Sequence, residues 1–197
     1  MKAGKALIVN SITADTDAYG MYAGANSEIL VEGDLEIKLV KTTGEHSVGL
    51  AVEGDNGEIH VKGNLKIPGY IESDDEGSGI MNDLNREGIV NKGKNGKLMI
   101  DGSANIVFNG GSSSESNTVI FASGENSHIR IGGGYIRAEG DDSCNYRLID
   151  GQNGTILINM NEDGTLAGDK ETVLYGTIFT NQPVSYTHLT LPTTPYV

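Results

Sequence analysis

One eight-residue pattern, Gly-x-Asn-[Ser/Gly]-x-[Ile/Leu]-x-[Val/Ile], occurs five times in this chain and constrains its fold more than any other feature. The copies read GANSEILV, GDNGEIHV, GKNGKLMI, GENSHIRI and GQNGTILI, and they begin at Gly24, Gly54, Gly93, Gly124 and Gly151. Successive copies start 30, 39, 31 and 27 residues apart, so insertions vary in length while the pattern does not. Repeats of this size are typical of solenoids, in which each unit buries its apolar face only against its neighbours.

Each unit reads as a strand, a Gly-x-Asn turn, a second strand, a glycine turn and a third strand. Apolar residues alternate within the strands, as Ile59 and Val61 do, so one face is buried and the other is wet. No segment shows helical periodicity, and units of about 30 residues are too small for a sandwich domain of roughly 100 residues. Residues 1–183 are therefore predicted to form a right-handed parallel β-helix of about six three-strand coils.

Stacking the coils places equivalent side chains above one another. The turn asparagines would form one column, because asparagine tolerates the left-handed backbone of a tight corner and stacked carboxamides can hydrogen-bond. The inward aliphatic residues would form a second column that holds the rod together, each contributing roughly 1.5–3 kcal/mol when fully buried. The predicted asparagine column is Asn26, Asn56, Asn95, Asn126 and Asn153, and the predicted aliphatic column is Ile29, Ile59, Leu98, Ile129 and Ile156.

Composition narrows the classes of partner. The chain carries 27 acidic and 14 basic residues, a formal net charge of −13, and this argues against nucleic acid and anionic membranes as partners because both repel a polyanion. The 28 glycines are about twice the usual share of roughly 7%, which suits short strands joined by tight turns. Cys144 is the only cysteine, so no intrachain disulfide can form. No apolar run approaches the roughly 18 residues that cross a bilayer.

The repeats, such as EILVEGDLEI and EIHVKGNLKI, and the near absence of cysteine resemble the passenger region of bacterial autotransporters and related surface adhesins. The resemblance covers residues 1 to about 182. It implies a non-enzymatic structural or adhesive stalk outside the bacterial cell, with a protein or glycan of a host or neighbouring cell as ligand. Neither a signal peptide nor a C-terminal barrel is found in the sequence, so the chain is interpreted as an internal fragment of a longer surface protein.

The alternative function is a polysaccharide-active β-helix enzyme, either a lyase or a glycoside hydrolase. Sugar hydrolysis needs two carboxylates roughly 5–10 Å apart in a groove. Two acidic pairs are the catalytic candidates, although acidic loops between coils are by default solvated surface and fold alone does not confer activity. These residues are Asp74, Asp75, Asp141 and Asp142.

No cofactor or metal site is predicted. Two segments offer oxygen ligands for calcium, Glu53–Glu58 and Asn161–Glu171, but neither has the alternating acidic ligands and closing glutamate of an EF-hand loop. His60 and His128 occupy equivalent outward positions two coils apart with Met99 between them, which argues against a histidine column. Tyrosines on a shared face would make a sugar-stacking strip, whereas their scattered positions predict dispersed packing. They are Tyr19, Tyr22, Tyr70, Tyr135, Tyr146 and Tyr175.

The last fourteen residues, VSYTHLTLPTTPYV, differ from everything before them because they contain no charge and no glycine. Their alternation is compatible with a strand that caps the open end. Residues 184–193, however, resemble the translation of a transposase-type sequencing adapter. Residues 184–197 are accordingly interpreted as a non-native tail and excluded from fold reasoning.

Overall fold

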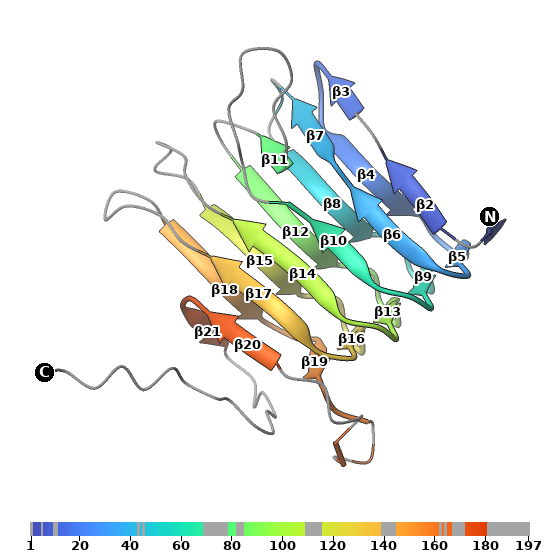
Figure 1. The fold of residues 1–197 in the computed structure, drawn as a ribbon, viewed down its shortest axis with the longest axis vertical. Helices are drawn as coiled ribbons and strands as arrows, with labels where there is room; N and C mark the ends of the chain where they lie inside the picture. The colour runs from blue at the N-terminus through green and yellow to red at the C-terminus, as the bar shows by residue number, and fades with distance from the viewer. Residues whose placement is uncertain are drawn as a thin grey trace, which may run out of the picture.

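The structure is a computed structural model that describes residues 2–4, 6–9, 12–42, 44, 46–68, 79–81, 85–108, 116–138, 145–161, 163, 165–166 and 172–180. These residues form an all-β parallel solenoid (Figure 1), which confirms the predicted fold class. The predicted tail, residues 184–197, lies outside the described residues. Among the residues described, no helix combines the length and apolar character needed to cross a bilayer.

Three parallel sheets of six strands make the walls of the solenoid. Sheet A contains β1 (Lys2–Ala3), β5 (Glu28–Val31), β9 (Glu58–Val61), β13 (Lys97–Ile100), β16 (His128–Ile131) and β19 (Thr155–Ile158). Sheet B contains β2 (Ala6–Val9), β6 (Asp34–Ile37), β10 (Leu65–Ile67), β14 (Ala104–Phe108), β17 (Gly134–Ala138) and β20 (Thr172–Tyr175). Sheet D contains β4 (Ala18–Ala23), β8 (His46–Val52), β12 (Asn85–Asn91), β15 (Ser116–Ala122), β18 (Asn145–Gly151) and β21 (Ile178–Thr180). Each sheet therefore takes one strand from each coil.

A fourth, three-stranded sheet is an addition to the predicted three strands per coil. Sheet C contains β3 (Ile12–Ala14), β7 (Leu39–Thr42) and β11 (Gly79–Met81). It lies between sheets B and D in the chain order of the first coils, and Val40 of β7 is fully buried in the main core. In these coils the connection from sheet B to sheet D is long enough to add one more short strand to the wall.

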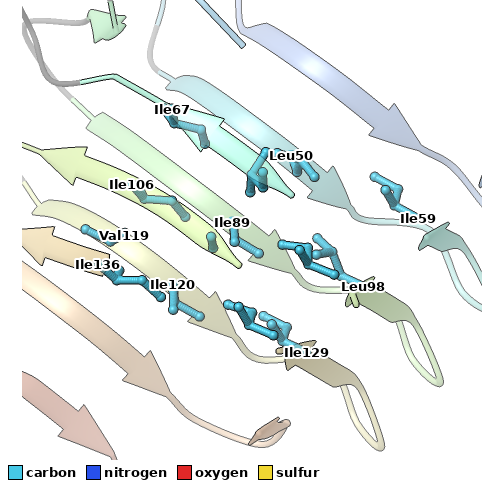
Figure 2. Close-up of a cluster of buried hydrophobic side chains, with 14 of the residues drawn as sticks. Leu50, Ile59, Ile67, Ile89, Leu98, Ile106, Val119, Ile120, Ile129 and Ile136 are labelled. Carbon is cyan, nitrogen blue, oxygen red and sulfur yellow. The ribbon is translucent and has the colours of Figure 1, made fainter. Parts of the chain in front are cut away.

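The interior is filled by stacked aliphatic side chains (Figure 2). In sheet A the register aligns Ile59 with Leu98 and Leu98 with Ile129, and all three are fully buried. The same column extends to Ile29 and Ile156 at its two ends, so the sheet A column has the membership that the repeat predicts. Each strand thus buries its inward residues against both neighbouring coils, as a solenoid requires.

In sheet D the inward and outward residues do not alternate strictly along each strand. In β15 the consecutive residues Val119 and Ile120 both face the main core, and Leu148 and Ile149 do the same in β18. Two inward residues in a row break the strict alternation of a strand. A second, smaller apolar cluster consequently lies on the outer side of sheet D, and it contains Val48, Ala51 and Val90 with Tyr19 and Phe121 packed against them.

Candidate functional site

The corner between sheets D and A is the most regular feature of the surface. Asn26, Asn56, Asn95 and Asn126 adopt φ values of 53°, 55°, 54° and 55°, which lie in the left-handed region. Most L-residues pay roughly 1–2 kcal/mol to enter this region, whereas asparagine enters it more readily because its short side chain can hydrogen-bond locally. The Gly-x-Asn pattern therefore marks the positions where the chain must turn sharply from one sheet into the next.

The corner asparagines are linked along the solenoid axis. Asn56 Nδ2 donates to Asn26 Oδ1 at 3.2 Å, and Asn95 Nδ2 donates to Asn56 Oδ1 at 3.2 Å. The backbone N–H of Asn26 also donates to the carbonyl of Asp55 at 2.9 Å. Side-chain bonds thus join the first three corners, and backbone bonds continue the link to the fourth, where the Asn95 N–H donates to the Glu125 carbonyl at 2.9 Å.

Asn153 does not continue this arrangement, although its copy of the pattern is well formed. It has no left-handed φ, and its Nδ2 donates to the Ser123 carbonyl at 3.3 Å. The register gives the reason: Ala122 pairs with Gly151 and His128 pairs with Thr155. In the fourth corner these paired positions, Ala122 and His128, are six residues apart. In the fifth corner the equivalent positions, Gly151 and Thr155, are four residues apart, so the fifth corner is two residues shorter than the fourth.

A buried asparagine braces the corner from inside. Asn91, at the end of β12, is fully buried, and its Nδ2 donates to the carbonyls of Gly96 at 2.9 Å and His128 at 3.0 Å. The residues aligned with it in the neighbouring coils are Val52 and Ala122. Both amide hydrogens are therefore used, whereas Asn91 Oδ1 is buried without a hydrogen-bond partner among the described residues. Sequence reasoning did not single out Asn91, since it lies outside the repeated pattern.

Charged side chains pair across neighbouring coils on the outer surface. Glu32 binds Lys2 at 2.7 Å and Lys62 at 2.9 Å, and hydrogen bonds from these two ammonium groups lower the pKa of Glu32 to about 2. Asp101 likewise bridges His60 at 2.8 Å and Arg130 at 2.7 Å. Exposed pairs of this kind stabilise little singly, because solvent screens them. These pairs instead help to fix how neighbouring coils align, because each pair links two different coils.

The outer side of sheet D carries the largest aromatic group among the described residues. One outward row takes a residue from each coil, and three of its six members are aromatic. The row is Tyr22, Ala51, Val90, Phe121, Asp150 and Phe179. Tyr22 and Phe179 are exposed, at 48% and 54%. We call this row, with its cationic neighbours, the aromatic face.

Cations and a tyrosine pair flank the aromatic face. Lys92 Nζ lies 5.8 Å from the centroid of the Phe121 ring, and Arg147 Cζ lies 4.8 Å from that of Phe179. These are cation–π distances. Tyr19 meets Tyr22 edge-on at 5.0 Å between centroids. Burial raises the pKa of the Tyr19 hydroxyl, and the Glu53 carboxylate raises it further, so this hydroxyl stays protonated and can donate.

Of the six tyrosines considered from the sequence, Tyr70 lies outside the described residues, and the other five are spread over several surfaces. Tyr19 and Tyr22 lie on sheet D, Tyr135 and Tyr175 lie on sheet B, and Tyr146 packs against the main core. The aromatic face is completed instead by Phe121 and Phe179, which sequence reasoning missed. Phe121 lies three residues before its corner glycine, as Ala51 and Val90 do, but Tyr22 lies two and Asp150 one residue before theirs, so only the register reveals the row.

An internal polar cluster lies at the opposite end of the sheet D strands. Arg86 is buried, with Nε donating to Asn117 Oδ1 at 3.0 Å and one terminal nitrogen donating to the Tyr146 hydroxyl at 2.6 Å. Its guanidinium carbon lies 5.8 Å from the Tyr146 ring centroid. These three residues come from β12, β15 and β18, so the cluster joins three successive coils.

The catalytic candidates Asp74, Asp75, Asp141 and Asp142 lie outside the described residues. The described part of the chain holds no group of three or more histidine, cysteine, aspartate or glutamate residues placed to bind a metal ion. In the first calcium candidate segment, Asp55 accepts from the backbone N–H of Lys94 at 3.2 Å. In the second, Asp163 accepts from the Thr165 hydroxyl at 2.6 Å.

Comparison with known proteins adds no relative: no protein-family model matches this chain, and neither the curated proteins nor the solved structures contain a significant match.

Proposed function

We propose that this chain is a structural stalk, a β-solenoid that holds surface features at fixed spacing, and that it belongs to a surface-displayed bacterial protein of the autotransporter type. The observation that carries the proposal is the repetition of contacts from coil to coil. The aliphatic column, the corner asparagines and the ion pairs each join neighbouring coils in the same way. A solenoid built from nearest-neighbour contacts is a rod whose length follows from coil number.

The dimensions suit a spacer. Six strands at about 4.8 Å give a stack roughly 24 Å long between the first and last strands of a sheet. The pairs on its surface, such as Lys66 Nζ with Glu36 Oε1 at 2.9 Å and Lys94 Nζ with Glu125 Oε2 at 2.8 Å, resist sliding of one coil over the next. If one coil slid along its neighbour, these opposite charges would separate and the corner asparagines would no longer align.

The location outside the cell is tested on cells that express the parent protein. An antibody raised against the recombinant chain is expected to label intact cells as strongly as permeabilised ones. Labelling only after permeabilisation would contradict the surface role. The enzymatic alternative is tested separately by incubating the chain with acidic polysaccharides. Cleavage that disappears when Asp74, Asp75, Asp141 and Asp142 are changed to alanine would replace the stalk proposal.

The aromatic face favours an adhesive role for the same stalk, with a glycan chain as ligand. Phe121 and Phe179 lie two strands apart in one row, which is roughly 10 Å and comparable to the length of a disaccharide. Aromatic rings bind the apolar faces of sugars. Phe179 is exposed and Phe121 is half-buried, and the Tyr22 hydroxyl and the flanking cations supply hydrogen-bond donors. Charge alone would not select a glycan, so the spacing of the rings carries this second proposal.

A glycan-binding screen tests the adhesive role. The unmodified chain is expected to retain a subset of glycans, and the double variant Phe121→Ala with Phe179→Ala, which removes the two rings spaced two strands apart, is expected to lose them. Tyr135→Ala is the matched control, because Tyr135 is an exposed aromatic residue on sheet B. Failure of the unmodified chain to bind any glycan, or equal loss in the control, would refute the adhesive role and leave the stalk proposal standing.

A further inference from the structure

Three of the described corners contain the dipeptide Asn-Gly: Asn56-Gly57, Asn95-Gly96 and Asn153-Gly154. This dipeptide is chemically labile. The backbone nitrogen after the asparagine can attack the side-chain carboxamide carbon, and a following glycine offers no side chain to obstruct the approach. The reaction needs the nitrogen and the carbon in a near-attack geometry. The fold therefore decides which of the three dipeptides reacts.

The corners at Asn56 and Asn95 hold this nitrogen in a hydrogen bond. The Gly57 N–H donates to the Gly54 carbonyl at 3.1 Å, and the Gly96 N–H donates to the Gly93 carbonyl at 3.0 Å. The carboxamides are engaged as well, since Asn95 donates to Asn56 along the corner column at 3.2 Å. Reaction at either site requires the corner to open first, which breaks contacts to the neighbouring coils.

The corner at Asn153 lacks these constraints. It is two residues shorter, Asn153 is exposed and outside the left-handed region, and its carboxamide makes a 3.3 Å bond to the Ser123 carbonyl. Within this described turn, the hydrogen bond from the Gly154 N–H to the Gly151 carbonyl, which would match those of the other two corners, is not formed. Both reacting groups are thus held less firmly here.

We propose that Asn153 is a site of spontaneous deamidation with water as the only co-reactant. The Gly154 nitrogen gives its proton to solvent and forms a bond to the Asn153 Cγ, and the carboxamide nitrogen leaves as ammonia. Water then opens the resulting cyclic imide at one of its two carbonyls. The product is aspartate or isoaspartate, either of which adds one negative charge beside β19. Isoaspartate also lengthens the main chain of the shortest corner by one methylene.

Timed peptide mapping by mass spectrometry tests this proposal on the full chain aged at mildly alkaline pH. Asn153 is expected to deamidate within a few-fold of the rate of a synthetic peptide spanning residues 150–156. Asn56 and Asn95 are expected to react about tenfold or more slowly than their own peptides, because their corners must open first. Mapping assigns each site separately, including Asn109-Gly110, which lies outside the described residues.

A parallel sample unfolded in urea is the control for the role of the fold. There the three sites are expected to react at similar rates, since their flanking dipeptide is the same. The variant Asn153→Gln is expected to remove the early isoaspartate signal of the folded chain at that peptide. Protection of Asn153 equal to that of Asn56 and Asn95 in the folded chain would overturn the proposal, and so would a faster reaction at Asn56.

Discussion

Shortening the side chain at the centre of the sheet A column tests the packing of the core most directly. Leu98 is fully buried on β13, with Ile59 aligned on one side and Ile129 on the other. Leu98→Ala removes contacts with both neighbouring coils and leaves a cavity that the regular stack cannot close by collapse. Leucine-to-alanine changes at such sites destabilise by about 3–5 kcal/mol, and the central position of Leu98 places it in that range.

The matched control is Met99→Ala, one residue further along the same strand. Met99 points outward between His60 and Arg130 and is half-buried, so its truncation is expected to cost about 1 kcal/mol or less. Both variants are compared with the parent by urea unfolding followed by far-ultraviolet circular dichroism. Because repeat arrays can lose two-state behaviour, the slope of each transition is compared before free energies are derived.

A Leu98→Ala cost below about 1 kcal/mol would place this side chain outside a packed core. Equal costs for Leu98→Ala and Met99→Ala would mean that the two faces of β13 are equivalent. Either result would refute the assignment of inward and outward faces on which the solenoid rests.

Three further predictions concern the corners and the surface charges. Gly93→Ala is expected to destabilise the chain by about 1–3 kcal/mol, because the added Cβ would overlap the Gly54 carbonyl oxygen. Gly24→Ala is expected to be tolerated, because its Cβ would meet Tyr22 at an ordinary 3.5 Å. Thermal melts compare the two variants, and equal melting temperatures would contradict the corner geometry. Asn95→Ala is expected to lower the free energy of unfolding by about 1–2 kcal/mol, because alanine is strained in the left-handed region. Asn95→Gly is expected to lower it less, since glycine enters that region freely. If chemical denaturation ranked the two variants in the opposite order, backbone strain would not be the cause. Because the pKa of Glu32 is lowered, its pairing with Lys2 and Lys62 is complete above the ordinary pKa of 4.5 and is lost as the pH falls toward about 2. A titration of the Glu32 carboxyl followed by NMR should have its midpoint near 2, and this midpoint should rise toward 4.5 when both lysines are changed to methionine. An ordinary midpoint in the unmodified chain would rule this pairing out.

The repeated pattern predicts the walls of the solenoid well because one physical requirement recurs in each coil. The inward positions of sheet A must be aliphatic, and the first four corners must adopt a left-handed backbone, so Ile59, Leu98, Asn56 and Asn95 can be read from spacing alone. The fifth corner shows where spacing fails. Residues after Asn153 align with earlier coils, while the strand before it continues through Gly151 and shortens the turn.

Features outside the repeated pattern can be recognised only from the pairing of the strands. Asn91 sits where neighbouring coils have Val52 and Ala122, and nothing in the local sequence distinguishes a buried bracing amide from an exposed one. The aromatic face joins Tyr22, Phe121 and Phe179 from coils of different length. Since insertions change the offset between these residues and their corners, only the pairing of strands brings them into one row.

The central claim is that each coil lies in parallel register between two others, and methyl-to-methyl nuclear Overhauser effects from Leu98 test it most directly. The structure predicts effects from the Leu98 methyl groups to both Ile59 and Ile129, which are 39 and 31 residues away in sequence and aligned with Leu98 on either side. Strand neighbours at about 4.8 Å are close enough for both effects to be strong. Effects to only one of the two, or to residues nearby in sequence instead, would contradict the solenoid.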